Sequence, residues 1–184
     1  MTALKKFDFV DQNKTLFVFG GSQGSIVINQ CVSEMIDDLK DVQVLWQTGM
    51  NHFEQYKHHE TNSVRVKPFI NDMKSAYAAA DLALTRAGAM TITELTACGV
   101  ASIMIPLPSA AEDHQTHNAA AMDKRDAAKM IPEADLSPDN LSILINQLFK
   151  DEYALNKMSK NSKALGKPNA VSVIADHILE RIST

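Results

Sequence analysis

The 184-residue sequence has no apolar run close to the roughly 20 residues that a membrane-spanning helix needs. Residues 1–5 do not resemble the start of a signal peptide, so none is predicted. Only two cysteines are present, Cys31 and Cys98, and both lie in apolar helical patterns without CxxC spacing. We therefore expect buried free thiols, a reducing compartment and a cytoplasmic location.

Positive charge is also scarce. Lysine and arginine total 18 against 22 aspartate and glutamate residues, for a net charge of −4. This balance argues against nucleic acid as the main partner, because phosphate binding needs a basic surface. The lysines of residues 157–167 are spread around a helical pattern and indicate a solvated face. The length suits one domain, and 45% hydrophobic residues allow a substantial core.

Strand-like and helix-like segments alternate along the chain, which predicts an α/β fold with a Rossmann-like parallel sheet covered by helices on both faces. Residues 1–14 are expected to form a lead-in or linker before a single domain of residues 15–184. The expected strands are residues 15–19, 42–47, 64–66, 82–85, 101–105 and 128–131. The expected helices are residues 25–39, 51–59, 74–80, 90–98, 118–124, 141–149, 152–165 and 171–182.

A glycine-rich turn directly follows the first expected strand, in the sequence Gly-Gly-Ser-Gln-Gly-Ser of residues 20–25. Such a turn gathers backbone N–H groups at the positive end of a helix dipole, which forms an anion site. The Lys-Ser/Thr ending of a Walker loop is absent, so a nucleoside triphosphatase is not favoured. Phe19 replaces the first glycine of GxGxxG, and no acid ends the second strand, which disfavours NAD. A turn that merely packs helix against strand is the alternative.

A second loop of small residues follows the fourth expected strand. Gly88 permits a close approach of ligand to backbone, and Thr91 and Glu94 lie about one turn apart on the next helix. A carboxylate at Glu94 can accept hydrogen bonds from both hydroxyls of a ribose. The alternative is a capping box, in which Thr91 and Glu94 satisfy the helix N-terminus.

A third loop, residues 106–118, follows the fifth expected strand and is polar and stiffened by proline. His114, Gln115 and Asn118 have helical spacing, so their side chains can converge on sugar hydroxyls. A metal site at His114 and His117 lacks a third ligand, and the sequence has no DxD motif. We expect no metal and no cofactor, with any diphosphate held by backbone amides and the helix dipole.

With residues 69–73 and 113–118, these loops make the chain resemble the MurG family of UDP-N-acetylglucosamine transferases. The resemblance runs from about residue 16 to the end, and four motifs occur in the expected order. It implies the C-terminal, donor-binding half of a GT-B glycosyltransferase, which inverts the sugar while transferring GlcNAc from UDP-GlcNAc to lipid I, forming lipid II of peptidoglycan synthesis. The family's acceptor half and its general base have no counterpart here, so we expect this chain alone to bind the donor without transferring it. The full enzyme would be peripheral on the cytoplasmic face of the membrane.

The resemblance also implies roles for individual residues. Ser22 and the amides around Gly21, Gln23 and Gly24 would contact the diphosphate. The other expected substrate-binding residues are Ile70 against uracil, Glu94 at the ribose hydroxyls, Ala89, Met90 and Thr91 at the phosphates and sugar, and Gln115 and Asn118 at the GlcNAc hydroxyls. His114 stands where some relatives carry glutamine, and is included with them.

Three other interpretations stay open. The chain can be the separate donor subunit of a split N-acetylglucosaminyltransferase, a UDP-sugar epimerase or hydrolase domain, or a non-catalytic interaction domain. Binding of UDP would separate the last from the others. The last expected helix can return to the other half of the enzyme, in which case its apolar face, Val173, Ile174 and Ile178, would be exposed in this chain.

Overall fold

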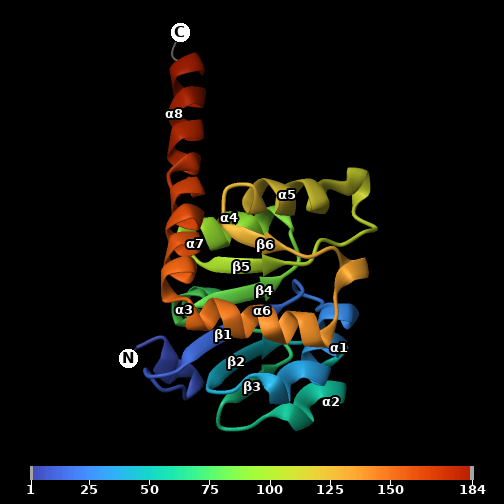
Figure 1. Cartoon of the computed structure of the whole chain (residues 1–184). Coiled ribbons are helices and arrows are strands. Elements are labelled where there is room, and N and C mark those ends of the chain that lie inside the picture. Colours follow the sequence, from blue (N-terminus) through green and yellow to red (C-terminus); the bar gives the residue numbers. More distant parts are fainter. Residues whose placement is uncertain (1, 183–184) are drawn as a thin grey trace.

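The computed structural model describes residues 2–182 and contains a six-stranded parallel sheet with the order β3-β2-β1-β4-β5-β6 (Figure 1). The predicted α/β class is therefore confirmed. The apolar runs set the strand positions within one residue of those expected. The strands are β1 (Lys14–Phe19), β2 (Val42–Gln47), β3 (Val64–Lys67), β4 (Leu82–Thr85), β5 (Ala101–Met104) and β6 (Ala128–Met130).

The helices also follow the expected pattern, although several boundaries differ. The helix expected over residues 51–59 is a short α-helix followed by a 3-10 turn, and the one expected over residues 118–124 begins four residues earlier. The α-helices are α1 (Ile26–Met35), α2 (Phe53–Tyr56), α3 (Met73–Ala79), α4 (Ala89–Cys98), α5 (His114–Asp123), α6 (Pro138–Lys150), α7 (Glu152–Leu165) and α8 (Ala170–Ile182).

Alternation along β1 divides the core into two layers. Leu16 and Val18 face one side of the sheet, where they pack in a cluster that includes buried residues of α1, α6 and α7. Phe17 and Phe19 face the other side, with buried residues of α3, α4 and α5. Because both faces are covered, every residue of β2, β4 and β5 is buried.

The residues before β1 pack on the domain. Leu4–Phe7 form a 3-10 turn, and Phe9 is buried in the layer that contains α3. Lys6 Nζ lies 2.6 Å from Asp72 Oδ2 and 2.8 Å from Ser75 Oγ at the start of α3. The guanidinium of Arg65 also lies over the Phe9 ring, 5.6 Å from its centroid.

The strand order reverses direction at one point on the sheet, between β1 and β4. From β1 the chain first proceeds to β2 and β3 on one side, and then returns to β4, β5 and β6 on the other. In such sheets, ligands bind outside the carboxyl ends of the strands where the order reverses, here between β1 and β4. The glycine turn follows β1 and the Arg86–Gly88 segment follows β4, so these two loops flank that point.

The C-terminal helix α8 extends away from the rest of the domain (Figure 1). None of its residues is buried, which agrees with the exposure expected for Val173, Ile174 and Ile178. Among the helices of residues 2–182, none combines the length and apolar character that crossing a bilayer requires.

One cysteine differs from the expectation. Cys31 is buried, and burial raises the pKa of its thiol to about 11. Cys98 is exposed, so the prediction of two buried thiols was wrong for it. The reason is the orientation of α4, which buries Leu95 and Thr96 and leaves Cys98, the last residue of the helix, at the surface.

Candidate functional site

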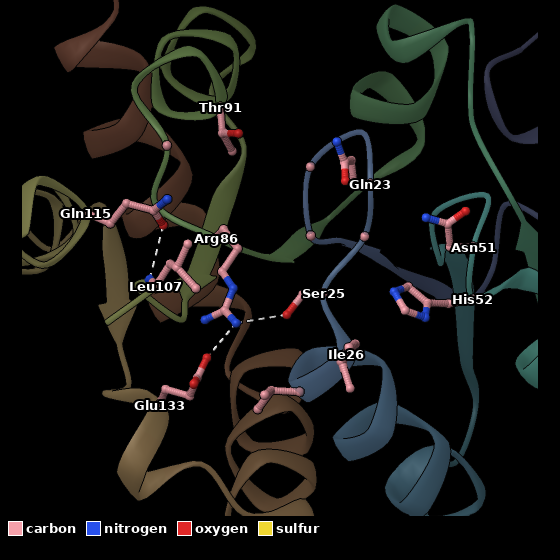
Figure 2. Close-up of a pocket in the computed structure, with 15 residues that line it drawn as sticks. Gln23, Ser25, Ile26, Asn51, His52, Arg86, Thr91, Leu107, Gln115 and Glu133 are labelled. Atoms are coloured by element: carbon pink, nitrogen blue, oxygen red, sulfur yellow. Dashed lines mark hydrogen bonds and ion pairs between the residues drawn. The ribbon is translucent and has the colours of Figure 1, made fainter. Parts of the chain in front are cut away.

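A cavity of about 460 Å³ opens at the reversal point of the sheet (Figure 2). The glycine turn and the start of α1 line one side, and the loops after β4 and β5 line the other. It contains expected site residues from three of the loops predicted to bind substrate. They are Gly21, Gln23, Gly24, Thr91 and Gln115.

The glycine turn is a closed structure that ends in the N-terminus of α1. The Gly24 N–H donates to the Gly21 carbonyl at 3.2 Å, and Ser25 is the N-cap, with its Oγ accepting from Ile28 N at 3.4 Å. Ser22 and Gln23 lie exposed in the turn, and Gln23 lines the cavity. Ser25 satisfies one of the first N–H groups of α1, and the remaining ones, with the positive end of the helix dipole, favour a negatively charged ligand here.

The loop after β2, at Thr48 and Gly49, packs against the outside of the glycine turn. Gly24 has a φ of 79°, and a Cβ placed on it would lie 1.8 Å from the carbonyl oxygen of Thr48. Asn29 in α1 donates to that same oxygen at 2.9 Å and accepts from Trp46 Nε1 at 2.9 Å. Only glycine fits this approach, so position 24 serves the packing of the turn as well as any ligand.

The N-terminus of α4 is the second helix start at the cavity. Its N-cap is Gly88, which makes no side-chain capping hydrogen bond, and Ala89 and Met90 are exposed. The capping-box alternative is therefore wrong, because Thr91 lies inside the first turn of the helix and not at its cap. The first N–H groups of a helix have no intrahelical acceptor, so those of residues 89–91 are available to a ligand.

Arg86 is a buried cation beside the cavity that the sequence reasoning did not single out. Its Nη2 lies 2.9 Å from Ser25 Oγ and 2.5 Å from Glu133 Oε2, as Figure 2 shows. Its Nη1 donates to the carbonyls of Ile105 and Pro106, each at 3.2 Å. Arg86 thus joins the cap of α1 to the loop after β5. The available signal was a lone charge directly after a buried strand.

Gln115 and Asn118 connect the loops on the far side of the cavity. Gln115 Oε1 accepts from Ala87 N and Leu107 N, each at 3.1 Å, and Asn118 Nδ2 donates to the Ala87 carbonyl at 3.1 Å. Gln115 lines the cavity, whereas Asn118 lines a neighbouring one of about 400 Å³ between α4, α5 and the start of α8. The two side chains therefore do not converge in one cavity. Each keeps one polar atom outside these bonds, Gln115 Nε2 and Asn118 Oδ1.

Neither Ile70 nor His114 lines the main cavity. The Ile70 side chain is buried in the core, and its N–H donates to Gln47 Oε1 at 2.8 Å, so the side chain itself does not face the cavity. The Nε2 of Gln47 donates to the Gly21 carbonyl at 3.0 Å, so this buried amide links two expected ligand segments. His114 is exposed, with its Nδ1 2.6 Å from the Ala111 carbonyl oxygen.

Glu94 lies outside the lining of the main cavity. Its Oε2 accepts a hydrogen bond of 2.7 Å from the Tyr77 hydroxyl in α3. Burial, together with the adjacent Glu94 carboxylate, raises the pKa of Tyr77 well above its ordinary value, so the hydroxyl stays a donor. Within residues 2–182, no three His, Cys, Asp or Glu side chains come together in a group that could hold a metal ion.

Residues 15–174 match the model of the glycosyltransferase family 28 C-terminal domain. The chain belongs to this family. A UDP-N-acetylglucosamine–N-acetylmuramyl-(pentapeptide) pyrophosphoryl-undecaprenol N-acetylglucosamine transferase of Christiangramia forsetii is 39% identical over 183 residues, covering 98% of this chain and 50% of the relative. The chain spans about half the length of the curated relatives it matches.

Solved structures agree with this family assignment. The crystal structure of Acinetobacter baumannii MurG superimposes with a TM-score of 0.85 at 30% identity, covering 98% of this chain and 53% of MurG. A UDP-N-acetylglucosamine 2-epimerase superimposes with a TM-score of 0.66 at 16% identity, covering 100% of this chain and 44% of the epimerase. The second likeness concerns the fold alone.

Proposed function

We propose that the cavity binds UDP-GlcNAc, and that this chain is the donor-binding half of an inverting transferase that transfers GlcNAc to lipid I. The observation that carries the proposal is the meeting of two helix N-termini, those of α1 and α4, at one cavity between β1 and β4. Membership of glycosyltransferase family 28 supports the nucleotide-sugar class. Relatives at 36–40% identity bear the transferase name.

The chemistry assigned to this half is stabilisation of the leaving group. When the acceptor hydroxyl attacks C1 of GlcNAc, negative charge develops on the departing UDP. Amides fixed at the start of α1 and α4 interact more strongly with that developing charge than with the ground state, and this difference lowers the barrier. Arg86 adds a positive charge close to the α1 cap, although Glu133 compensates much of it.

The remaining roles follow the shape of the donor. We assign the diphosphate to Ser22 and the amides of Gly21, Gln23 and Gly24, the last of which also donates to the Gly21 carbonyl at 3.2 Å. The amides of Ala89, Met90 and Thr91 lie opposite. We assign the ribose hydroxyls to Glu94 and the uracil edge to the Ile70 carbonyl. We assign the sugar hydroxyls to Gln115 Nε2 inside the cavity, and to Asn118 and His114, which lie outside its lining.

The acceptor side belongs to the part of the relatives that this chain does not match. We propose that lipid I and the group that activates its hydroxyl lie there, that residues 1–14 join the two halves, and that the complete enzyme acts at the cytoplasmic face of the membrane. The chain alone is then expected to bind UDP-GlcNAc weakly and to transfer nothing.

Calorimetric titration of the chain with UDP-GlcNAc, UDP-GalNAc and UDP tests this proposal. We expect saturable binding of UDP and UDP-GlcNAc, and weaker binding of UDP-GalNAc because Gln115 and its neighbours contact the sugar hydroxyls. Lys157→Ala, at a surface ion pair with Asp126 outside the cavity lining, is the matched control and should bind as the parent does. Absence of UDP binding at millimolar concentration would refute the donor-domain assignment.

A further inference from the structure

Tyr77 is a buried tyrosine in α3 that the expected roles leave without a function. Its hydroxyl donates to Glu94 Oε2 at 2.7 Å, and this bond links α3 to α4. Tyr77 retains only 4% of its accessible surface, while Glu94 is partly exposed. The bond therefore connects the fixed interior of the domain to a carboxylate that solvent or ligand can reach.

The core holds the tyrosine ring in place from the side of the sheet. The ring lies edge-on to Phe17, with centroids 5.7 Å apart, and edge-on to Phe19, with centroids 5.9 Å apart. Both phenylalanines belong to β1, which runs directly into the glycine turn. Aromatic edge contacts of this kind restrict the ring, so the position of the hydroxyl is set by the packing of β1 and α3.

Glu94 has little else to hold it. Among residues 2–182, Tyr77 is the one donor to its carboxylate, and no lysine or arginine forms an ion pair with it. A glutamate side chain in a helix has several accessible rotamers, and ordering it costs conformational entropy. A hydrogen bond that selects one rotamer before the ligand arrives removes part of that cost from binding.

We infer that Tyr77 is a positioning residue that holds Oε2 of Glu94 so that Oε1 stays available to accept hydrogen bonds from the ribose hydroxyls of the nucleotide. The inference rests on the proposed function, because it takes Glu94 to be the ribose ligand. It assigns Tyr77 a purpose that packing alone does not require, since phenylalanine would fill the same space between Phe17, Phe19 and α4. It also predicts that loss of the Tyr77 hydroxyl weakens binding only of nucleotides that carry the ribose hydroxyls.

Tyr77→Phe with two nucleotides tests the inference. By calorimetry, Y77F should bind UDP about 5-fold or more weakly than the parent, since a hydrogen bond to a charged group is lost. It should bind 2′,3′-dideoxy-UDP as the parent does. Tyr56→Phe removes another buried tyrosine hydroxyl, away from the cavity lining, and is expected to leave both affinities unchanged.

A double-mutant cycle with Glu94→Ala isolates the pair. In the E94A background, Y77F should cause no further loss of UDP affinity, because the carboxylate it positions is gone. The inference is overturned if Y77F leaves UDP binding unchanged, if it weakens UDP and dideoxy-UDP equally, or if its effect persists in E94A.

A second measurement covers the case in which Y77F does not fold. The chain contains three tyrosines, so 3-fluorotyrosine labelling gives a simple fluorine NMR spectrum of the parent protein. The Tyr77 signal should shift on saturation with UDP and shift less with dideoxy-UDP. Equal shifts with both nucleotides would overturn the inference.

The outcomes separate the two levels of proposal. If the parent binds UDP and dideoxy-UDP equally, Glu94 does not bind ribose and the role of Tyr77 is refuted, whereas donor binding stands. If the parent binds no UDP at all, both are refuted.

Discussion

The starts of α1 and α4 face the same cavity but are built differently. The N-terminus of α1 is capped by Ser25, whose hydroxyl Arg86 holds in place, and the preceding turn is packed against Thr48. The N-terminus of α4 starts at Gly88 without a side-chain cap. The difference indicates that α1 and its turn supply amides held in a fixed frame, whereas α4 supplies amides at an uncapped helix start, whose missing partners a ligand can provide.

The largest effect expected concerns the fixed frame of α1 and its turn. Gly24→Ala places a Cβ 1.8 Å from the Thr48 carbonyl oxygen at a φ of 79°, so we expect a loss of unfolding free energy of about 3 kcal/mol or more, from overpacking and backbone strain together. Urea denaturation measures it. Gly21→Ala is the matched control, because its φ is 89° but nothing lies within 4 Å of the added Cβ, and it should cost only about 1–2 kcal/mol. Equal losses for the two would contradict the packing role of position 24.

The next effect concerns the cation that holds the α1 cap. Arg86→Met leaves Glu133 without its partner and the Ser25 hydroxyl without its donor, so we expect about 2–3 kcal/mol of destabilisation, since the glutamate is partly exposed. The double variant R86M/E133Q should recover part of the loss in the same denaturation experiment. An R86M protein as stable as the parent would show that Arg86 does not hold the two loops together.

The third prediction concerns a variant in which α4, like α1, has a side-chain cap at its N-terminus. Gly88 has φ −67° and ψ 148°, which suits a capping side chain, and its added Cβ would meet only Thr91 Oγ1, at 3.8 Å. Gly88→Asp should raise stability by a few tenths of a kcal/mol and lower UDP affinity about tenfold or more, because the carboxylate occupies the amides and repels the diphosphate. Gly88→Ala adds the Cβ without a cap and controls for sterics. If calorimetry gives the two variants the same UDP affinity, the α4 amides do not bind the phosphates.

The smallest effect concerns α3, a third helix start, which lies outside the cavity lining. Hydrogen bonds from Lys6 and then Ser75 lower the pKa of its N-cap, Asp72, to about 2, from an ordinary value of 3.8. A depressed pKa contributes stability above the unfolded pKa, and that contribution is lost as the pH falls from about 3.8 to about 2. Asp72→Asn should flatten the acid dependence of stability in that window without altering UDP affinity. An unchanged pH profile would contradict the shift.

Much of the fold follows from local patterns. The buried strands β2 and β4 are short, mostly apolar segments with the predicted boundaries, and α7 starts and ends at the predicted residues. The glycine turn after β1 was likewise recognisable, because glycines between a strand and a helix indicate a tight backbone turn that leads into the helix N-terminus. Local sequence carries these features since each depends on neighbours a few residues away.

The parts that sequence did not reveal depend on distant partners. Arg86 bonds to Ser25 and Glu133, 61 and 47 residues away, so its position after a buried strand marked it as unusual without indicating its partners. The Thr91–Glu94 spacing is compatible both with a capping box and with a pair of ligand-binding residues. In the structure neither residue caps the helix. The partner of Glu94 is Tyr77 on another helix, and only the packing of α3 against β1 brings that hydroxyl to it.

The most direct test of donor binding between two helix starts is an NMR titration of the ¹⁵N-labelled chain with UDP. We expect saturable shifts that are largest for the amides of residues 21–26 and 88–91, with small changes in α8 and around the start of α3. This expectation would be contradicted by the absence of shifts at millimolar UDP, or by shifts confined to residues outside these two segments.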